Sequence, residues 1–304
     1  MSKEEGAGIG HIVQSLVTNL VIATSKLVAA LISGSGALLA ETLHSFGDCG
    51  NQILLLVGVR QARKPPDAKH PLGQGRAVYF WSFMVAMLLF MGGGVFSIYE
   101  GVHKMQHPEP VEDITVGLIV LGISILLEGY STFSNIKEMN KRRGAKSFRK
   151  YLRDSKDSDL IVVFGENSAA VVGLVFALVA VLLAKQTGDG RYDAAGSLAI
   201  GLVLVFVAIF LAREVKSLLV GESADPEVEK VVRELAVADP NVDELIRMLS
   251  IQQGPGEVIL ALKVRIKRGL ESQEVAEAIN AFEERITERF PEVKWTFVEP
   301  DVAD

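Results

Sequence analysis

Long apolar stretches separated by short polar segments dominate the first part of the chain. A helix needs about 20 mostly apolar residues to cross the hydrocarbon core of a bilayer. Six stretches meet this requirement, each bounded by glycine, proline or charged residues: 11–32, 36–59, 78–102, 114–135, 160–184 and 192–212. So many apolar stretches in one region are not expected of buried helices in a soluble protein. We therefore predict an α-helical membrane domain with six transmembrane helices over residues 1–216.

The pattern changes after Arg213 to that of a soluble domain. Apolar positions spaced for one helical face or alternating along a strand predict five elements. These are a helix over 226–237, strands over 243–252 and 258–266, a helix over 275–286 and a strand over 294–299. The order α-β-β-α-β suits a small open sheet with helices on one side, of the ferredoxin-like kind. We place this second domain at residues 217–304.

Basic residues are concentrated in two of the connections, 60–76 and 137–156. The connections at 33–35, 103–113 and 185–191 carry few basic residues. Because basic loops remain on the cytoplasmic side, this asymmetry predicts that both termini are cytoplasmic. The N-terminal segment lacks a small-residue cleavage site, so we expect its apolar run to be retained as a helix. The predicted location is the bacterial inner membrane or an equivalent membrane.

The overall composition excludes several classes of function. The formal net charge of -6 argues against nucleic acid as a partner. Cys49 is the only cysteine in the sequence, which excludes an intrachain disulfide and a cysteine-based zinc cluster. No nucleophile triad, phosphate-binding glycine loop or Walker-type lysine is visible, so we expect neither an enzyme nor an ATP-driven pump.

Four polar residues interrupt the second apolar stretch at helical spacing: Glu41, His44, Asp48 and Asn51. Polar and ionisable groups at membrane depth are costly and are therefore candidates for function. His44 and Asp48 lie one turn apart, so an imidazole nitrogen and a carboxylate oxygen can converge on one ion. Zinc accepts such a mixed ligand set. The alternative is a polar stripe that forms hydrogen bonds with a neighbouring helix.

Further ligands are available on the fifth stretch, where Glu166 offers a carboxylate and Asn167 an amide oxygen. The alternative for Glu166 is an ion pair with a basic residue of the 137–156 segment. Glu128, in the fourth stretch, is another acid at membrane depth that lines an access path or bonds a neighbouring helix. Lys26, in the first, can pair with an acid or extend toward the membrane surface.

Several segments together resemble the cation diffusion facilitator family. They are AETLHSFGDCGNQ at 40–52, HPLGQGRAVYFW at 70–81, SKDSDLIVVFGENSAAVVG at 155–173, DAAGSLAIG at 193–201 and the C-terminal domain. The resemblance implies a homodimer with six helices per subunit and a cytoplasmic metallochaperone-like domain. It also implies export of zinc, or of manganese, iron, cobalt or cadmium, in exchange for protons, with no prosthetic group.

The resemblance also implies which residues hold the ion. His44 and Asp48 match the family's metal pair in the second helix. The usual His-x-x-x-Asp pair of the fifth helix reads Val163 and Asn167 here. One subgroup has a Glu-Asp pair instead, which Glu166-Asn167 resembles with the aspartate replaced by its amide. The expected metal site is therefore His44, Asp48, Glu166 and Asn167.

Two functional hypotheses follow from these residues. The first is a proton-coupled exporter of a divalent transition metal, with zinc foremost. The second is a metal-sensing or scaffold membrane protein that has lost transport, a hypothesis motivated by the amide at Asn167. A passive channel fits poorly because nothing resembles a filter ring or pore loop. A nitrogen and oxygen ligand set is also compatible with iron, cobalt and manganese, so the metal is not fixed by the sequence.

Overall fold

The computed structural model describes residues 3–33, 36–107 and 115–301. Within these ranges it does not describe the side chains of residues 3–9, 11, 29–30, 32–33, 36–44, 116–117 and 154. The chain divides into two compact units. One comprises Met1–Arg60 and Val78–Lys216, and the other comprises Gln61–Ala77 and Ser217–Asp304.

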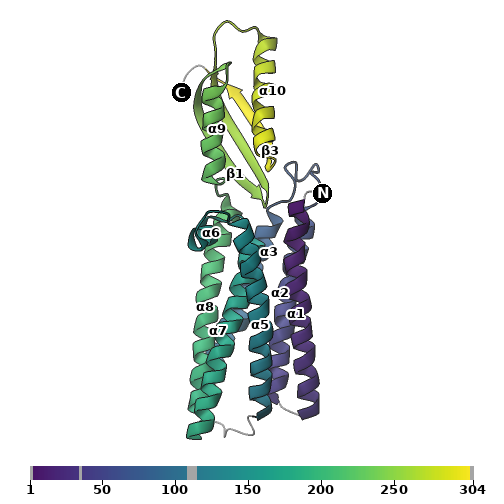
Figure 1. Cartoon of the computed structure of the whole chain (residues 1–304), viewed down its shortest axis with the longest axis vertical. Coiled ribbons are helices and arrows are strands. Elements are labelled where there is room, and N and C mark those ends of the chain that lie inside the picture. The colour runs from purple at the N-terminus through teal and green to yellow at the C-terminus, as the bar shows by residue number, and fades with distance from the viewer. Residues whose placement is uncertain (1–2, 34–35, 108–114, 302–304) are drawn as a thin grey trace. The chain divides into compact units, whose positions relative to one another are not determined.

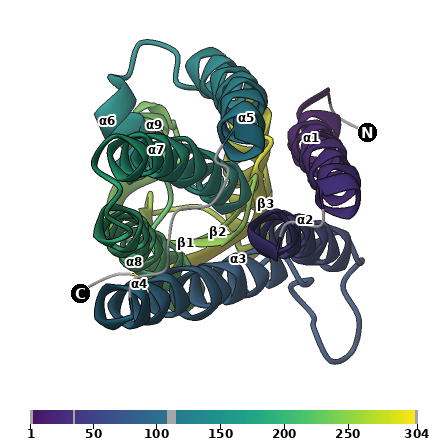
Figure 2. The same ribbon diagram turned by 90° about the horizontal axis from the view of Figure 1, so that it is seen from below.

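The first unit is a bundle of long helices (Figure 1). Its helices are α1 Lys3–Ser33, α2 Gly36–Ala62, α3 Ala77–Leu88, the π-helix η1 Leu89–Val95, α4 Phe96–Gln106, α5 Thr115–Arg142, α6 Phe148–Asp154, α7 Ser158–Thr187 and α8 Arg191–Val220. The segments α3, η1 and α4 follow one another without a break, so they form one long helical rod. α5 packs along α7, and α1 packs against both; Figure 2 looks along the bundle and shows α5 beside its two neighbours.

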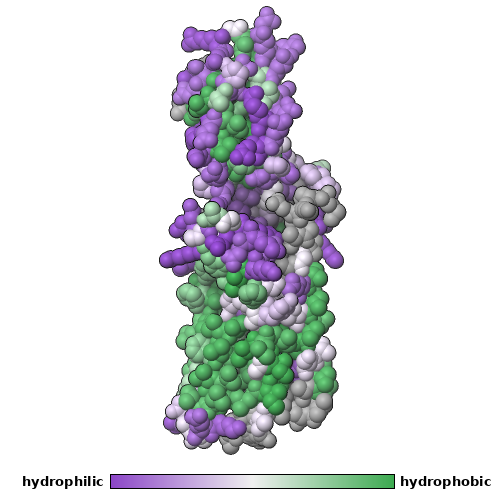
Figure 3. Space-filling model, in the orientation of Figure 1, coloured by the Kyte–Doolittle hydropathy of each residue, from purple (hydrophilic) through white to green (hydrophobic). Residues whose placement is uncertain are grey.

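The bundle has the surface of a membrane protein. Figure 3 shows a broad hydrophobic zone over its helices with hydrophilic residues at both ends. Large apolar side chains lie exposed on the outside, including Val17, Phe96, Leu126, Phe133 and Phe206. On a soluble protein such a surface would favour aggregation, whereas hydrocarbon chains cover it readily.

Four helical segments within the described part of the chain are long and apolar enough to cross a membrane. They are Ala77–Gln106, Leu118–Arg142, Ser158–Thr187 and Arg191–Val220. These four confirm the predictions for the third to sixth stretches and define a multi-pass membrane protein. In α1 the apolar part found is shorter, Ile12–Val28. α2 carries Asp48, Asn51 and Gln52, which lower its mean hydropathy. The membrane spans of α1 and α2 therefore stay predictions.

Close packing between η1 and α8 forms one wall of the bundle interior. A Cβ atom added to Gly94 would lie 2.6 Å from Val205 Cγ2, and one added to Gly201 would lie 2.9 Å from the Gly94 carbonyl oxygen. Both distances are too short for any side chain. Small residues at such crossings let helix backbones approach one another in membranes. The contact also fixes Leu204, which lies 3.1 Å from the Cβ position of Gly93.

A short helix that was not predicted, α6, lies between α5 and α7. Its residues Tyr151 and Leu152 pack with Met139 of α5 and Leu160 of α7 in a small apolar cluster. The sequence analysis treated this region only as a basic loop. An apolar face on a helix this short gives a weak sequence signal, and the charged residues around it dominate the pattern.

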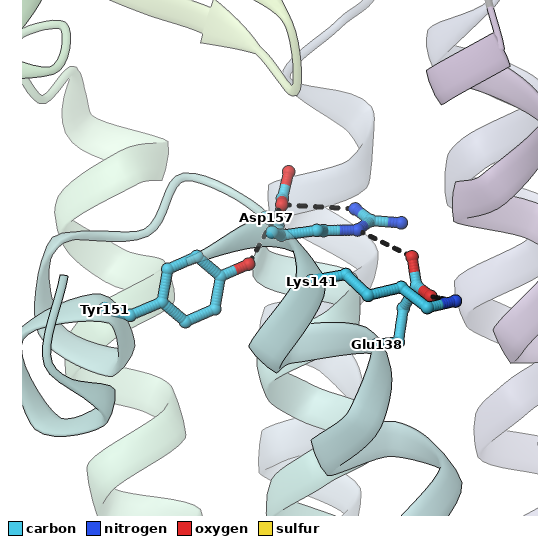
Figure 4. A network of polar contacts seen from close by, with 5 residues as sticks. Glu138, Lys141, Tyr151 and Asp157 are labelled. Atoms are coloured by element: carbon cyan, nitrogen blue, oxygen red, sulfur yellow. Dashed lines mark hydrogen bonds and ion pairs between the residues drawn. The ribbon is translucent and has the colours of Figure 1, made fainter. Parts of the chain in front are cut away.

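Polar contacts fix this connection at its edge (Figure 4). Arg142 Nη1 donates to Asp157 Oδ2 at 3.2 Å, and Arg142 Nε donates to Glu138 Oε1 at 3.2 Å. The Tyr151 hydroxyl donates to Asp157 Oδ2 at 3.4 Å. Burial, with a smaller effect from the Asp157 carboxylate, raises the pKa of Tyr151 to about 12, so the hydroxyl remains a donor at physiological pH.

The second unit contains a three-stranded sheet with the order β1-β2-β3. Its elements are α9 Pro226–Ala238, β1 Val242–Gly254, β2 Glu257–Ile266, α10 Ser272–Arg289 and β3 Val293–Pro300. β2 pairs antiparallel with β1 and parallel with β3. The inward-facing residues of β2 pack with α9 and α10 in a core that includes Val232, Leu260, Phe282 and Ile286. All five predicted elements are confirmed, and their bounds lie within a few residues of those expected.

Candidate metal site in the helical bundle

A polar cavity lies inside the first unit, and we refer to it as the central cavity. Six helical elements line it, through Asn19, Asp48, Gln52, Leu89, Glu128, Glu166, Asn167, Ala170 and Leu204. Three of the four predicted site residues therefore lie on one cavity: Asp48, Glu166 and Asn167. Glu128 lines the same cavity.

Glu166 is the residue whose surroundings are most informative. It lies in the first half of α7 and is only 7% exposed. Its Oε1 accepts a hydrogen bond from Asn51 Nδ2 at 2.7 Å. Its Oε2 is buried and has no hydrogen-bond partner among the described residues. The partner that Glu166 has is thus an amide of α2, not a basic residue of the 137–156 segment, and one carboxylate oxygen is free to bind a cation.

Asn167 is held by the neighbouring helix α5. Its Nδ2 donates to Ser131 Oγ at 3.1 Å, and the residue is 2% exposed. Because an amide nitrogen is a hydrogen-bond donor, only Oδ1 can serve as a ligand. The structure thus places Asn167 beside the cavity and gives it a hydrogen bond to a neighbouring helix.

Negative charge is concentrated around the central cavity. Asp48 and Glu128 both act electrostatically on Glu166. Carboxylates held together in a poorly hydrated interior repel one another and need a compensating positive charge. A divalent cation or protons can supply that charge.

His44 belongs to α2, one turn before Asp48, but its side chain lies outside the described part of the structure, as does that of Glu41. Among the side chains that are described, no group of three or more histidine, cysteine, aspartate or glutamate residues is close enough to hold a metal ion. The described side chains therefore do not make up a complete metal site by themselves.

Two polar residues of the cavity were missed by the sequence analysis, Asn19 and Gln52. Asn19 Nδ2 donates to Gln52 Oε1 at 3.1 Å, and Gln52 Nε2 donates to Ser15 Oγ at 3.1 Å. Their signal in the sequence was the same as that of Asn51: an amide inside an apolar stretch. The analysis weighed charged residues and passed over these neutral ones.

Lys26 and Cys49, the other unusual residues at membrane depth, do not line the central cavity. Lys26 is buried and its Nζ donates to Ser45 Oγ at 2.9 Å, so it does not extend to the membrane surface. Cys49 is buried by packing, which agrees with its rotation away from Asp48 along the helix.

Comparison with known families identifies the class of protein. Residues 12–220 match the model of the cation efflux transmembrane domain. The match covers more than half of the chain, and the chain therefore belongs to the cation efflux family. Its members are transporters rather than enzymes, as the sequence analysis expected.

Similar proteins come from distant organisms. The proton-coupled zinc antiporter SLC30A9, mitochondrial, of Xenopus laevis is 36% identical over 69% of this chain and 38% of its own length. The uncharacterized transporter MJ0449 of Methanocaldococcus jannaschii is 25% identical over 96% of this chain and 98% of its own. The cation-efflux pump FieF of Shewanella oneidensis is 29% identical over 59% and 61%. The chain spans less than two-fifths of the SLC30A9 relatives it matches.

Proposed function

We propose that this protein exports a divalent transition metal, zinc foremost, in exchange for protons through a site built on His44, Asp48, Glu166 and Asn167. The observation that carries the proposal is Glu166. It is buried at the cavity shared with Asp48 and Glu128, and its Oε2 has no partner in the described part of the chain. A buried carboxylate oxygen close to other acids is suited to bind a cation reversibly.

The choice of zinc has two supports. A site that combines an imidazole with carboxylate oxygens matches zinc chemistry. The SLC30A9 relatives also carry zinc and proton antiport in their printed names. Manganese, iron, cobalt and cadmium are the other ions to test, because oxygen-rich sites also accept harder ions.

The proposed topology has six spans per subunit and both termini in the cytoplasm. Residues 1–216 form the transport domain in this proposal, and residues 217–304 form a metallochaperone-like domain of the ferredoxin-like kind. The basic residues of the connections at 60–76 and 137–156 support this topology. The two compact units of the structure support a division into two domains.

The direct test is metal uptake by the purified protein in vesicles, with each of the five ions in turn. An exporter gives uptake above that of protein-free vesicles for at least one of them. The alternative, a metal-sensing or scaffold protein, binds metal without any flux. Binding without flux for every ion would overturn the proposal in favour of this alternative.

Asn167→Asp is expected to tighten metal binding by about tenfold or more, equal to ~1.4 kcal/mol. The substitution adds a carboxylate to the central cavity with almost no change in size. Ser131 can rotate its hydroxyl to donate where it now accepts, so the local packing is preserved. The measurement is the zinc Kd by calorimetry on the purified full chain.

The control is Asn140→Asp, which makes the same chemical change on an exposed part of α5, where Asn140 accepts from Arg143. We expect no change in metal affinity for this variant. Equal affinities for Asn167→Asp and the unmodified protein would show that Asn167 is not a ligand.

The isolated fragment 221–304 is expected to be soluble and dimeric and to bind zinc weakly. It has its own core, and it contains neither histidine nor cysteine. The sheet face opposite the helices is apolar in two cross-strand rows, Leu249–Ala261–Phe297 and Ile251–Ile259–Trp295. Leu249 and Phe297 are more than half exposed in the monomer, so pairing of two such faces would bury them. Sedimentation gives the mass of the fragment and calorimetry its zinc affinity.

Phe297→Asp should convert the fragment to a monomer without unfolding it. Val237→Asp is the matched control, because Val237 is a highly exposed apolar residue on α9, away from that sheet face. If the fragment with Phe297→Asp is still a dimer, the interface lies elsewhere. Tight zinc binding by the unmodified fragment would contradict the expectation of weak binding.

A further inference from the structure

A second cavity lies between α1, α5 and α7, and we refer to it as the side cavity. It is lined by Gln14, Ser15, Ser131, Ser134, Asn135, Val163 and Asn167. Six of these seven residues are amides or serines. So many polar side chains packed between apolar helices are costly unless their hydrogen bonds are satisfied.

The side chain of Asn135 has no hydrogen-bond partner among the described residues. It is 4% exposed, and both its Nδ2 and Oδ1 are buried without a hydrogen-bond partner in the described part of the chain. Leaving a buried polar group without a hydrogen-bond partner destabilises the folded protein. An amide with two such atoms on the wall of a polar cavity points to a ligand that can both accept and donate. Water has this property, and polar cavities hold it favourably.

The side cavity is separated from the central cavity by two amide side chains. Asn167 lines both cavities and donates to Ser131 on the side-cavity wall. Gln52 lines the central cavity, and its Nε2 donates to Ser15 of the side cavity. At the opposite edge, exposed Gln14 donates to Ser134 Oγ at 2.8 Å. Polar groups therefore continue from the surface of the bundle to the carboxylates.

The chemistry of the side cavity separates it from the metal site. None of its seven lining residues is ionisable. Neutral amides and hydroxyls bind water well but give a divalent transition metal no charged or imidazole ligand. A proton can cross such a space along hydrogen-bonded water, and no side chain of the cavity has to change its protonation state.

We propose that the side cavity holds ordered water and gives protons, but not the metal ion, a route between the bundle surface and the central cavity. Asn135 is the residue that orders water in it, and Gln52 and Asn167 form the boundary that water must pass. The inference deepens the proposed function, on which its transport part rests. Its hydration part does not depend on transport.

Hydration is tested with the full chain in membranes by thiol labelling. Cys49 is the only cysteine, so Cys49→Ser gives a cysteine-free background. Ser131→Cys in this background should react with a small hydrophilic methanethiosulfonate reagent at least about tenfold faster than Ser25→Cys. Ser25 is the matched control because it is exposed on the bundle surface, outside either cavity, and its hydroxyl bonds its own helix at Val21. Equal labelling rates would overturn the inference.

The proton route is tested with Asn135→Leu and Asn135→Ser. Leucine should exclude water, slow the thiol labelling of the Ser131→Cys variant, and lower zinc-driven proton flux at least fivefold while the zinc Kd changes less than twofold. Serine keeps a polar group and space for water, so it should retain most of the flux. Thr132→Val, which removes a hydroxyl that bonds Glu128 O within α5, should behave like the unmodified protein.

The outcomes separate this inference from the proposed function. If the unmodified protein moves no metal, the exporter proposal fails, and labelling still decides whether the side cavity is hydrated. If the protein exchanges zinc for protons but Asn135→Leu leaves the flux unchanged, the proton route lies elsewhere. Equal loss of flux in the leucine and serine variants would show that Asn135 only supports packing.

Discussion

Asp48→Asn and Glu166→Gln are each expected to reduce metal flux to the level of protein-free vesicles. Both residues line the central cavity and each would supply a charged oxygen to the ion. Losing one ligand from a set of about four weakens binding and also leaves the ion's charge less compensated at membrane depth. We expect the same loss of flux for His44→Ala, and this expectation rests on the sequence alone. Flux is measured in vesicles with a metal-sensitive dye, at equal amounts of inserted protein.

Asp193→Asn is the control for this experiment. Asp193 lies in the first turn of α8 and pairs with Lys104 at 3.3 Å, and it does not line the central cavity. The substitution removes a carboxylate from the same bundle, yet flux should stay near that of the unmodified protein. Undiminished flux in both Asp48→Asn and Glu166→Gln would refute the site.

Acidifying the compartment that receives the metal is expected to accelerate metal movement, with protons moving the opposite way. When the ion leaves, the carboxylates of Asp48, Glu128 and Glu166 lose the positive charge that compensated them in a poorly hydrated cavity. Protons are the available replacement, and a proton on a ligand atom blocks metal at that atom. Each pH unit of gradient contributes about 1.4 kcal/mol per proton, equal to a tenfold concentration ratio.

The measurement uses a pH-sensitive dye inside the vesicles while an ionophore holds the membrane potential constant. A matching proton signal for every metal that moves is the expected result. A channel would show metal flux that follows only the metal gradient and the potential. Robust metal flux with no proton signal would exclude exchange.

The sequence predicted those parts of the molecule that follow from local pattern. Alternation along 258–266 predicted a strand because its inward residues, such as Leu260, must reach the core. Charge at membrane depth identified Asp48 and Glu166 because few acids are tolerated there without a function. Neither inference needed knowledge of how helices pack.

What the sequence did not predict depends on the rotation and register of packed helices. The hydrogen bond from Asn51 to Glu166 joins α2 to α7, and no local pattern specifies which faces of the two helices meet. The same holds for Asn19 with Gln52, which became significant only once the bundle placed them together. The π-helical turn at η1 was also missed, because backbone widening of this kind has no simple residue code.

The α6 connection has a mechanical consequence for ion binding. Because the contacts of Tyr151, Arg142 and Asp157 fix the ends of α5 and α7 to each other, these two helices form one stiff hairpin that carries both Glu128 and Glu166. Asp48 stands on α2, outside that hairpin. In the proposed site, an ion that takes one oxygen from Asp48 and one from Glu166 would add a second bridge between this hairpin and α2, beside the hydrogen bond from Asn51 to Glu166. The bound cargo would then limit how far the two parts can move against each other.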